Sequence, residues 1–311
     1  MSWQRPDGRI NFREWRLTLP SLGWLLVFFM IPSLIILVIS FRTPDVTGGV
    51  GGGWTLGNWS AWLHADVRVL ALRTLWVSGV TTAVCLALGI PMAWFMARCS
   101  ATWRGALLLL VIIPFWTNFL IRVFAWKVLL NQDGLFTRLA RVLHLAGDHD
   151  TLLYNQGAVW LVLAYTHLPF AILPLYAAAE KFDFALLEAA RDLGVTAARA
   201  FLMVFIPGVS AGIGAGALMV FVSVLGNYIV PEVVGGHASD MIGNRIAQRA
   251  FADRNLPEAS ALASGLALAA VALSVALWRR RPRPDGTDLT DDKEEFLADR
   301  RSHPPRRRAF P

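Results

Sequence analysis

The stretch Glu188-Ala-Ala-Arg-Asp-Leu-Gly194 is a polar segment between two long apolar segments, and Pro207 lies early in the second of them. Apolar residues recur here at three- and four-residue spacing, which predicts a short amphipathic helix over residues 182–193. Gly194 is placed to end the helix, because glycine readily adopts the left-handed conformation that closes many helices. We expect a docking face at a membrane surface, although the spacing alone is also typical of an ordinary interfacial helix. The apolar residues are Leu186, Leu187, Ala190 and Leu193.

The composition is that of an integral membrane protein. Hydrophobic residues make up 55% and charged residues 16% of the 311 residues, and the mean hydropathy is +0.49, unlike soluble globular chains. About 20 consecutive apolar residues cross the hydrocarbon core of a bilayer. Six such runs predict an all-α fold of six transmembrane helices. The six runs are Pro20–Phe41, Leu70–Ala97, Gly105–Leu130, Gly157–Ala179, Phe201–Leu225 and Ala259–Trp278.

Both termini are expected on the cytoplasmic side. Six spans place the two ends on one side, and cytoplasmic flanks carry an excess of Lys and Arg. Arginines cluster before the first span and after the last, whereas a smaller group falls on the opposite side and weakens the pattern. The first cluster is Arg5, Arg9, Arg13 and Arg16, the second is Arg279, Arg280, Arg281 and Arg283, and the opposing group is Arg245, Arg249 and Arg254.

The chain therefore divides into three expected regions. Residues 1–19 form a cytoplasmic segment, residues 20–278 form the six-span domain, and residues 279–311 form a cytoplasmic tail whose composition is typical of disorder. The loop at residues 180–200 carries the predicted amphipathic helix to the cytoplasmic side. The first apolar run should remain as an uncleaved anchor, because no small-residue cleavage site follows it.

Other functions lack the residues that they require. The net charge of +7 comes mainly from basic residues at span ends, where lipid headgroups neutralise them, so no nucleic-acid partner is predicted. The glycine run at residues 47–53 lacks the Gly-Lys-Ser/Thr of a phosphate loop and is interpreted as a flexible linker. No residues stand at metal-ligand spacing. Cys85 and Cys99 lie about 20 Å apart along one helix, which excludes a disulfide.

Polar residues and helix breakers within the spans are candidates for function, because polar groups are costly in lipid. The third span carries Asn118 and Arg122 in its second half, and Arg122 either lines a pore or extends to the outer surface. Pro169 and Pro174 predict a kinked fourth span. The fifth span has a small-residue stripe that allows close helix approach, either within the bundle or to a partner subunit. The stripe consists of Gly208, Gly212 and Gly216.

Several stretches, in this order, resemble one family: the inner-membrane permease subunits of bacterial type I ABC importers, in particular those of spermidine/putrescine systems. The resemblance extends from about Thr55 to Trp278. The stretches that carry it are Pro91-Met-Ala-Trp-Phe-Met-Ala-Arg98, Pro114-Phe-Trp-Thr-Asn-Phe-Leu-Ile-Arg122, Leu168-Pro-Phe-Ala-Ile-Leu-Pro-Leu-Tyr176, Leu187-Glu-Ala-Ala-Arg-Asp-Leu-Gly194, Gly226-Asn-Tyr-Ile-Val-Pro-Glu-Val-Val-Gly-Gly236 and Met241-Ile-Gly-Asn244.

The resemblance implies a type I ABC importer permease fold in the bacterial inner membrane, with a cytoplasmic coupling helix. It also implies three kinds of partner: a second permease, a pair of cytoplasmic ATPases that bind ATP and Mg, and a periplasmic solute-binding protein. This chain would be no enzyme and would hold no cofactor or metal. The residues implied to couple it to the ATPase are Glu188, Ala189, Ala190, Arg191, Asp192, Gly194 and Pro207.

A polyamine is multiply cationic and favours carboxylates or aromatic faces along its path. The spans lack a central Asp or Glu, and Asn227 stands where members of the family often carry an acidic residue. Import of putrescine or spermidine is expected, with another small organic or cationic solute as the alternative. Aromatic packing or interfacial anchoring would equally explain the path candidates. These candidates are Trp116, Asn118, Tyr165, Asn227, Tyr228 and Glu232.

Two other classes of protein serve as rival hypotheses. An intramembrane enzyme needs paired catalytic groups within the spans, and His167, the one histidine inside a predicted span, has no such pairing in the sequence. An ion-coupled secondary carrier usually shows repeated halves and intramembrane charges. Neither feature is evident, and dependence on a partner ATPase would distinguish the carrier from the importer.

Overall fold

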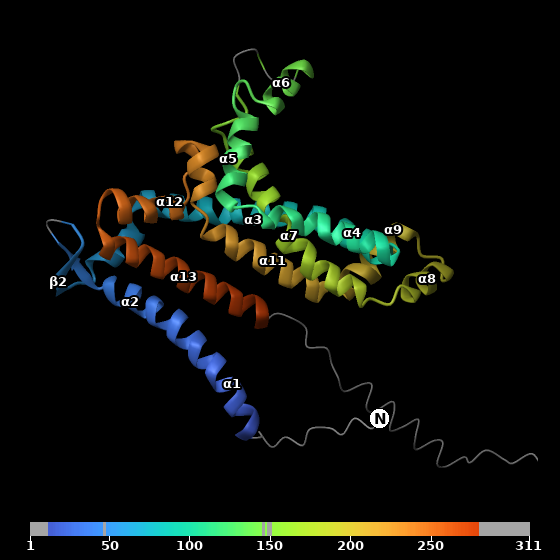
Figure 1. The fold of residues 1–311 in the computed structure, drawn as a ribbon, viewed down its shortest axis with the longest axis horizontal. Coiled ribbons are helices and arrows are strands. Elements are labelled where there is room, and N and C mark those ends of the chain that lie inside the picture. The colour runs from blue at the N-terminus through green and yellow to red at the C-terminus, as the bar shows by residue number, and fades with distance from the viewer. Residues whose placement is uncertain (1–11, 46–47, 145–146, 148–150, 280–311) are drawn as a thin grey trace, which may run out of the picture. The chain divides into compact units, whose positions relative to one another are not determined.

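The computed structural model describes residues 12–45, 48–144, 147 and 151–279, and these residues are mainly helical (Figure 1). The chain divides into two units, residues 1–272 and 273–311, and the second is described only at the end of α13. The longer helices are α1 (Phe12–Leu25), α3 (Ala65–Arg98), α4 (Ala101–Ile112), α5 (Phe119–Leu130), α7 (Gln156–Glu180), α11 (Ser210–Leu225) and α13 (Leu256–Arg279).

Shorter elements connect these helices. The short α-helices are α2 (Ile31–Ile39), α6 (Leu135–Val142), α8 (Ala185–Asp192), α9 (Ala197–Ala200), α10 (Ile206–Gly208) and α12 (Ile242–Ala247). The π-helical turns are η1 (Leu26–Met30), η4 (Phe201–Phe205), η5 (Pro231–Gly235) and η7 (Gln248–Ala252). The 3₁₀ turns are η2 (Gly57–Leu63), η3 (Ile113–Trp116) and η6 (His237–Ser239). The strands are β1 (Arg42–Pro44) and β2 (Val50–Trp54).

Within the first unit, α3, α7 and α11 lie side by side and enclose the main core (Figure 1). These helices are apolar on most of their surface, which suits burial on several sides. Small residues let α3 approach α7: Cys85 Sγ lies 3.6 Å from the carbonyl oxygen of Ala164, and Gly89 faces Leu175. α7 is assigned as one helix through Pro169 and Pro174.

The glycine stripe of the fifth predicted span packs within the chain. A Cβ atom at Gly212 would lie 2.8 Å from the carbonyl oxygen of Pro174 on α7. A Cβ atom at Gly216 would lie 3.1 Å from the carbonyl oxygen of Ala171. Two of the three stripe glycines therefore serve contact between α11 and α7, as small residues do between membrane helices. Gly208 instead faces the ring of Phe182.

The described residues contain six candidate membrane spans when bent helix pairs are counted as single spans. Four are unbroken helical segments: Leu19–Ile39, Ala65–Arg98, Gln156–Glu180 and Leu256–Ala276. The other two join Ala101–Trp116 to Phe119–Val142 at an angle of 92°, and Ala197–Gly208 to Ser210–Leu225 at 70°. The predicted number of spans is confirmed, but the third and fifth are bent rather than straight.

The break in the third span has a local cause. Asn118 accepts a hydrogen bond of 2.8 Å from the backbone nitrogen of Leu120 and begins α5 as its N-cap. Pro114 lies in the short turn η3 just before the break, where the missing N–H favours the end of a helix. An N-cap requires non-helical backbone at its own position, so a helix cannot continue from α4 through Asn118.

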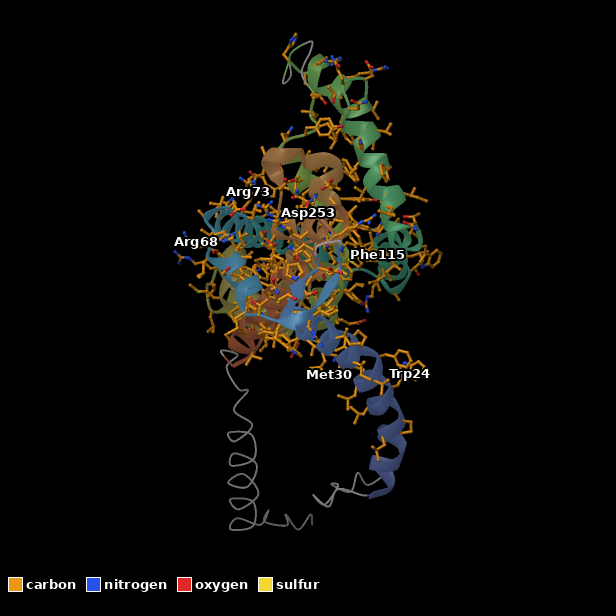
Figure 2. All side chains as sticks on the ribbon, turned by 90° about the vertical axis from the view of Figure 1, so that its left-hand side faces the viewer. Trp24, Met30, Arg68, Arg73, Phe115 and Asp253 are labelled. Carbon is orange, nitrogen blue, oxygen red and sulfur yellow. The ribbon has the colours of Figure 1, made fainter. Side chains whose placement is uncertain are left out.

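The first span leaves its apolar surface open. No residue of Leu19–Ile39 is buried. The side chains of Trp24 and Met30 point away from the ribbon (Figure 2). Helix α1 begins at Phe12, so the end of the expected cytoplasmic segment at 1–19 is helical. Residues 1–11 and the expected tail after Arg279 lie outside the described residues.

The glycine run forms a hairpin instead of the predicted flexible linker. Strand β2 pairs antiparallel with β1, with Arg42 opposite Trp54, and the Arg42 guanidinium lies 4.2 Å above the Trp54 ring. A Cβ atom at Gly51 would lie 2.8 Å from Thr43 Oγ1, so glycine permits the pairing. Gly48 and Gly49, with φ of +90° and +106°, form part of the turn.

Candidate functional site

The predicted amphipathic helix is present as α8, and Gly194 closes it as expected. Gly194 has φ +85° and donates from its backbone nitrogen to Arg191 at 2.9 Å, while Val195 donates to Ala190 at 3.1 Å. These two bonds define a Schellman motif, which satisfies carbonyl groups at a helix end. The polypeptide then leaves α8 in a direction fixed by a left-handed residue that favours glycine.

The four apolar residues of this segment face two ways. Leu187 is partly buried and packs against the core, and Ala190 is also partly buried. Leu186 and Leu193, by contrast, are 53% and 85% exposed. An apolar pair exposed beside charged residues makes this segment a candidate docking surface. The same segment lines an open hollow of about 660 Å³ with Glu188, Arg191, Asp192, Gly194, Val195, Thr196 and Ala197.

The charges of α8 are free of partners within the part of the chain that the structure describes. Glu188, Arg191 and Asp192 are exposed and form no salt bridge or side-chain hydrogen bond there. Ala189 is exposed and Ala190 is half-buried between them. Pro207 lies apart from α8, in α10 just before the 70° bend.

The path candidates of the third and fourth spans lie on exposed surface. Trp116 ends η3 and is 77% exposed, and Asn118 next to it is exposed but uses its carboxamide oxygen as a cap. Tyr165 on α7 has its ring 5.3 Å from that of Trp126. Arg122 is half-buried, with its guanidinium 5.1 Å from the centre of the Phe115 ring.

His167 is a structural residue within α7. Its Nδ1 lies 2.9 Å from the carbonyl oxygen of Leu163 and 3.0 Å from the Thr166 hydroxyl. The side chain is buried, and no carboxylate contacts it among the described residues. These local hydrogen bonds fix the orientation of the imidazole ring within α7.

The remaining path candidates share one turn between α11 and α12. Asn227 accepts a bond of 3.1 Å from the backbone nitrogen of Val230. Asn244 Nδ2 donates to the carbonyl oxygen of Tyr228 at 3.0 Å and to Glu232 Oε2 at 2.9 Å. Asn244, which sequence reasoning quoted but assigned no role, therefore organises the turn. Gly243 beside it lets α12 approach Asn227.

Glu232 also lines an acidic hollow of about 620 Å³ at the start of α3. Its charged lining residues are Asp66, Glu232, Asp240 and Arg245. Asp66 and Arg245 form a salt bridge, and Arg73 donates to the backbone oxygen of Asp240 at 3.4 Å. Three carboxylates and one guanidinium leave the lining net negative, which favours a cationic ligand.

A bundle of bent and straight apolar helices long enough to cross a membrane, with a short exposed helix on a connecting loop, defines a helical membrane protein. Residues 89–283 match the family model of the binding-protein-dependent transport system inner membrane component, and the chain belongs to this family. It is similar to the spermidine/putrescine transport system permease protein PotB of Haemophilus influenzae, with 35% identity over 83% of this chain and 90% of that protein.

Two further permeases are similar to this chain. The permease PotB of Escherichia coli is 35% identical over 83% of this chain and 94% of its own length. The inner membrane ABC transporter permease protein YdcU of the same organism is 33% identical over 79% of this chain and 82% of its own. The type I importer permease fold is confirmed by a bacterial ABC transporter involved in the import of the acidic polysaccharide alginate, with a TM-score of 0.67, 15% identity and coverage of 86% and 94%. Family membership also favours an importer over an enzyme or an ion-coupled carrier.

Proposed function

We propose that this chain is one of two permease subunits of an ATP-driven polyamine importer, with both termini in the cytoplasm. The observation that carries the proposal is the 35% identity, over 83% of the chain, to spermidine/putrescine permeases. The acidic hollow beside Glu232 supports the same solute class, because ammonium groups are attracted to a net negative lining. Aromatic faces at Trp116, Tyr165 and Tyr228 offer further cation contacts.

Three partners complete the proposed importer. A second permease forms the other half of the path, a pair of cytoplasmic ATPases binds ATP and Mg, and a periplasmic protein delivers the solute. One solved neighbour in fold is a bacterial alginate ABC transporter in complex with a periplasmic protein that holds an alginate pentasaccharide. In this chain the exposed Leu186 and Leu193, with the unpaired charges of α8, supply a surface suited to a cytoplasmic partner.

The proposed mechanism is alternating access. Closure of the ATPase pair on ATP displaces α8, and the packed helices convert this displacement into opening and closing of the path. The permease itself makes and breaks no covalent bond. Glu188 and Asp192 offer carboxylates to basic groups of the ATPase, and the Gly194 turn holds α8 in its docking orientation.

Fewer of the path candidates are suited to bind a cation than the sequence alone indicated. Asn118 and Asn227 use their side-chain oxygens to cap local backbone, and their amide nitrogens only donate hydrogen bonds, so they cannot accept one from an ammonium group. The hydrogen-bond partner of Glu232 is the neutral amide of Asn244, and no Lys or Arg forms a salt bridge with it within the described residues. We assign ammonium recognition to Glu232 within the acidic hollow.

The test is uptake of radiolabelled putrescine and spermidine into proteoliposomes that hold the complete complex, with ATP inside and the binding protein outside. We expect ATP-dependent uptake with the wild-type chain and loss of uptake with Glu188→Arg. Asp133→Arg reverses an exposed charge outside α8 and should leave uptake intact. If the wild-type complex hydrolyses ATP but moves neither polyamine, the polyamine assignment is wrong, and other small organic cations become the solutes to test.

A further inference from the structure

Five aromatic side chains, here named the aromatic clasp, form a continuous cluster beside α8. Each ring contacts at least one other, and they come from α3, from the short link before α8 and from the π-helical turn η4. Ring centres lie 5.8 Å apart for Trp94–Phe201, 5.2 Å for Phe201–Phe205, 5.2 Å for Phe182–Phe205, 5.4 Å for Phe182–Phe184 and 6.3 Å for Phe184–Phe205.

Phe205 is the centre of the clasp. It is 1% exposed and contacts the rings of Phe182, Phe184 and Phe201. Gly208 makes room for this arrangement, because a Cβ atom there would overlap the Phe182 ring. Gly208 belongs to the glycine stripe, yet its contact is with an aromatic ring of the link rather than with a helix backbone.

Arg98 closes the clasp on the side of α3. Its guanidinium lies 4.9 Å from the centre of the Trp94 ring and 5.8 Å from that of Phe184. It forms no salt bridge within the described part of the chain. Cation–π attraction to two rings therefore connects the last turn of α3 to the residue that immediately precedes α8.

The clasp holds both ends of the α8 loop. Phe182 and Phe184 lie just before α8, whereas Phe201 and Phe205 lie just after α9, at the beginning of the bent fifth span. Between these points much of the surface of α8 is exposed. A displacement of α8 would therefore press on rings that pack around the buried Phe205, and closely packed side chains transmit a shift because they hardly compress.

We propose that the aromatic clasp and Arg98 are positioning residues that carry the displacement of α8 to α3 and to the fifth span together. This inference rests on the proposed function, in which α8 docks on an ATPase. A force on α8 then moves Phe184 against Arg98 and Trp94 while Phe182 moves against Phe205. The two spans respond as one body rather than one after the other.

The test measures coupling in the complete complex in proteoliposomes. Phe205→Leu removes ring contacts but keeps an apolar side chain, and Arg98→Gln removes the cation at the edge of the clasp. For both variants we expect basal ATP hydrolysis, measured without the binding protein, within twofold of wild type but at least fivefold less polyamine taken up per ATP. Stimulation of hydrolysis by the loaded binding protein should fall in parallel. Arg98→Lys, which keeps a cation, should recover part of the lost coupling.

Phe95→Leu is the matched control, because Phe95 is the exposed neighbour of Trp94 on α3; its coupling should match wild type. A purely structural role would lower uptake and hydrolysis in proportion to the amount of intact complex. That result, or unchanged uptake per ATP in Arg98→Gln and Phe205→Leu, would overturn the proposal. If the complex with Phe205→Leu does not assemble, the Arg98→Gln variant alone still tests the proposal. Failure of the proposed function is distinct, since the wild-type complex itself would then show neither polyamine uptake nor stimulated hydrolysis.

Discussion

The carboxamide nitrogen of Asn244 donates a hydrogen bond of 2.9 Å to the carboxylate of Glu232. The same nitrogen donates to the backbone of Tyr228 at 3.0 Å, and the amide oxygen accepts from Met241 at 3.1 Å. A neutral donor orients Glu232 without cancelling its charge. Asp66, in contrast, has the guanidinium of Arg245 as its partner. Glu232 is therefore more available to a cation than Asp66 is.

Replacing Asn244 with Asp should disrupt this turn. The variant removes both donated bonds and sets a second carboxylate beside Glu232, and each unsatisfied buried group costs about 1–3 kcal/mol. We expect a lower thermal unfolding temperature in detergent and a loss of polyamine uptake of at least tenfold. Thermal unfolding and uptake by the reconstituted complex are the two measurements.

The double variant Glu232→Gln with Asn244→Asp exchanges the donor and the acceptor. The introduced glutamine amide can donate to the introduced aspartate, so stability should recover in part, although the bond from the side chain of residue 244 to Tyr228 stays absent. Uptake should remain low because the negative charge of position 232 is lost. Full recovery of uptake in the double variant would show that transport does not require the carboxylate to stand at position 232.

Gly212→Ala should destabilise the helix bundle, whereas Gly79→Ala should not. A methyl group at Gly212 meets Ala178 and the Pro174 carbonyl on α7, while Gly79 has no neighbouring atom within 4 Å. Overpacking costs about 1–3 kcal/mol. An open helix position instead gains about 1 kcal/mol from the better helix propensity of alanine. Thermal unfolding of the two variants in the same detergent checks the difference, and equal effects would contradict the close approach of α11 to α7.

Gly194→Val should uncouple ATP hydrolysis from polyamine uptake. Gly194 has φ +85°, a conformation that costs other residues roughly 1–2 kcal/mol and is less favourable still for a β-branched side chain. The end of α8 must then rearrange, so we expect retained basal hydrolysis with at least tenfold lower uptake. Gly194→Asn is the matched control, because asparagine tolerates the left-handed region. Normal uptake by the valine variant would argue against a docking role for this turn.

The sequence predicted the elements that follow from local pattern. Apolar length predicted the six spans, and three- and four-residue spacing followed by glycine predicted α8 and its closing turn at Gly194. The stripe at Gly212 and Gly216 predicted close helix packing. Each of these signals comes from residues that lie close together in the sequence, within the length of one span at most. Over such distances the geometry of the chain alone links residue type to structure.

Features that depend on distant contacts were not predictable in this way. The sequence does not show whether Asn118 is a polar residue within a continuous helix or the cap that begins a new one. The hairpin at Gly51 depends on its contact with Thr43, which lies on the other strand. Asn244 acts on Tyr228 and Glu232 across a turn whose path the sequence does not specify. The aromatic clasp joins Trp94 to Phe201 across the bundle. Its only signal in the sequence is the presence of aromatic residues on both sides of the α8 loop.

Labelling of Cys99 tests the proposed orientation in the membrane. Cys99 follows the last residue of α3 and is partly exposed, whereas Cys85 is buried in the same helix. A thiol must be accessible to react, so a membrane-impermeant maleimide should modify Cys99 in inside-out vesicles and not in right-side-out vesicles. Cys99→Ser should abolish the signal, and Cys85 should react only after unfolding.

The same label locates the coupling helix, because Arg98 beside Cys99 lies over the ring of Phe184, the residue before α8. Modification from the inside-out face therefore places α8 on the cytoplasmic side, where an ATPase can reach Leu186 and Leu193. Modification only from the right-side-out face would place α8 outside the cell and would contradict the coupling role. The arginine clusters at the two ends of the chain, which the positive-inside rule assigns to the cytoplasm, favour the first result.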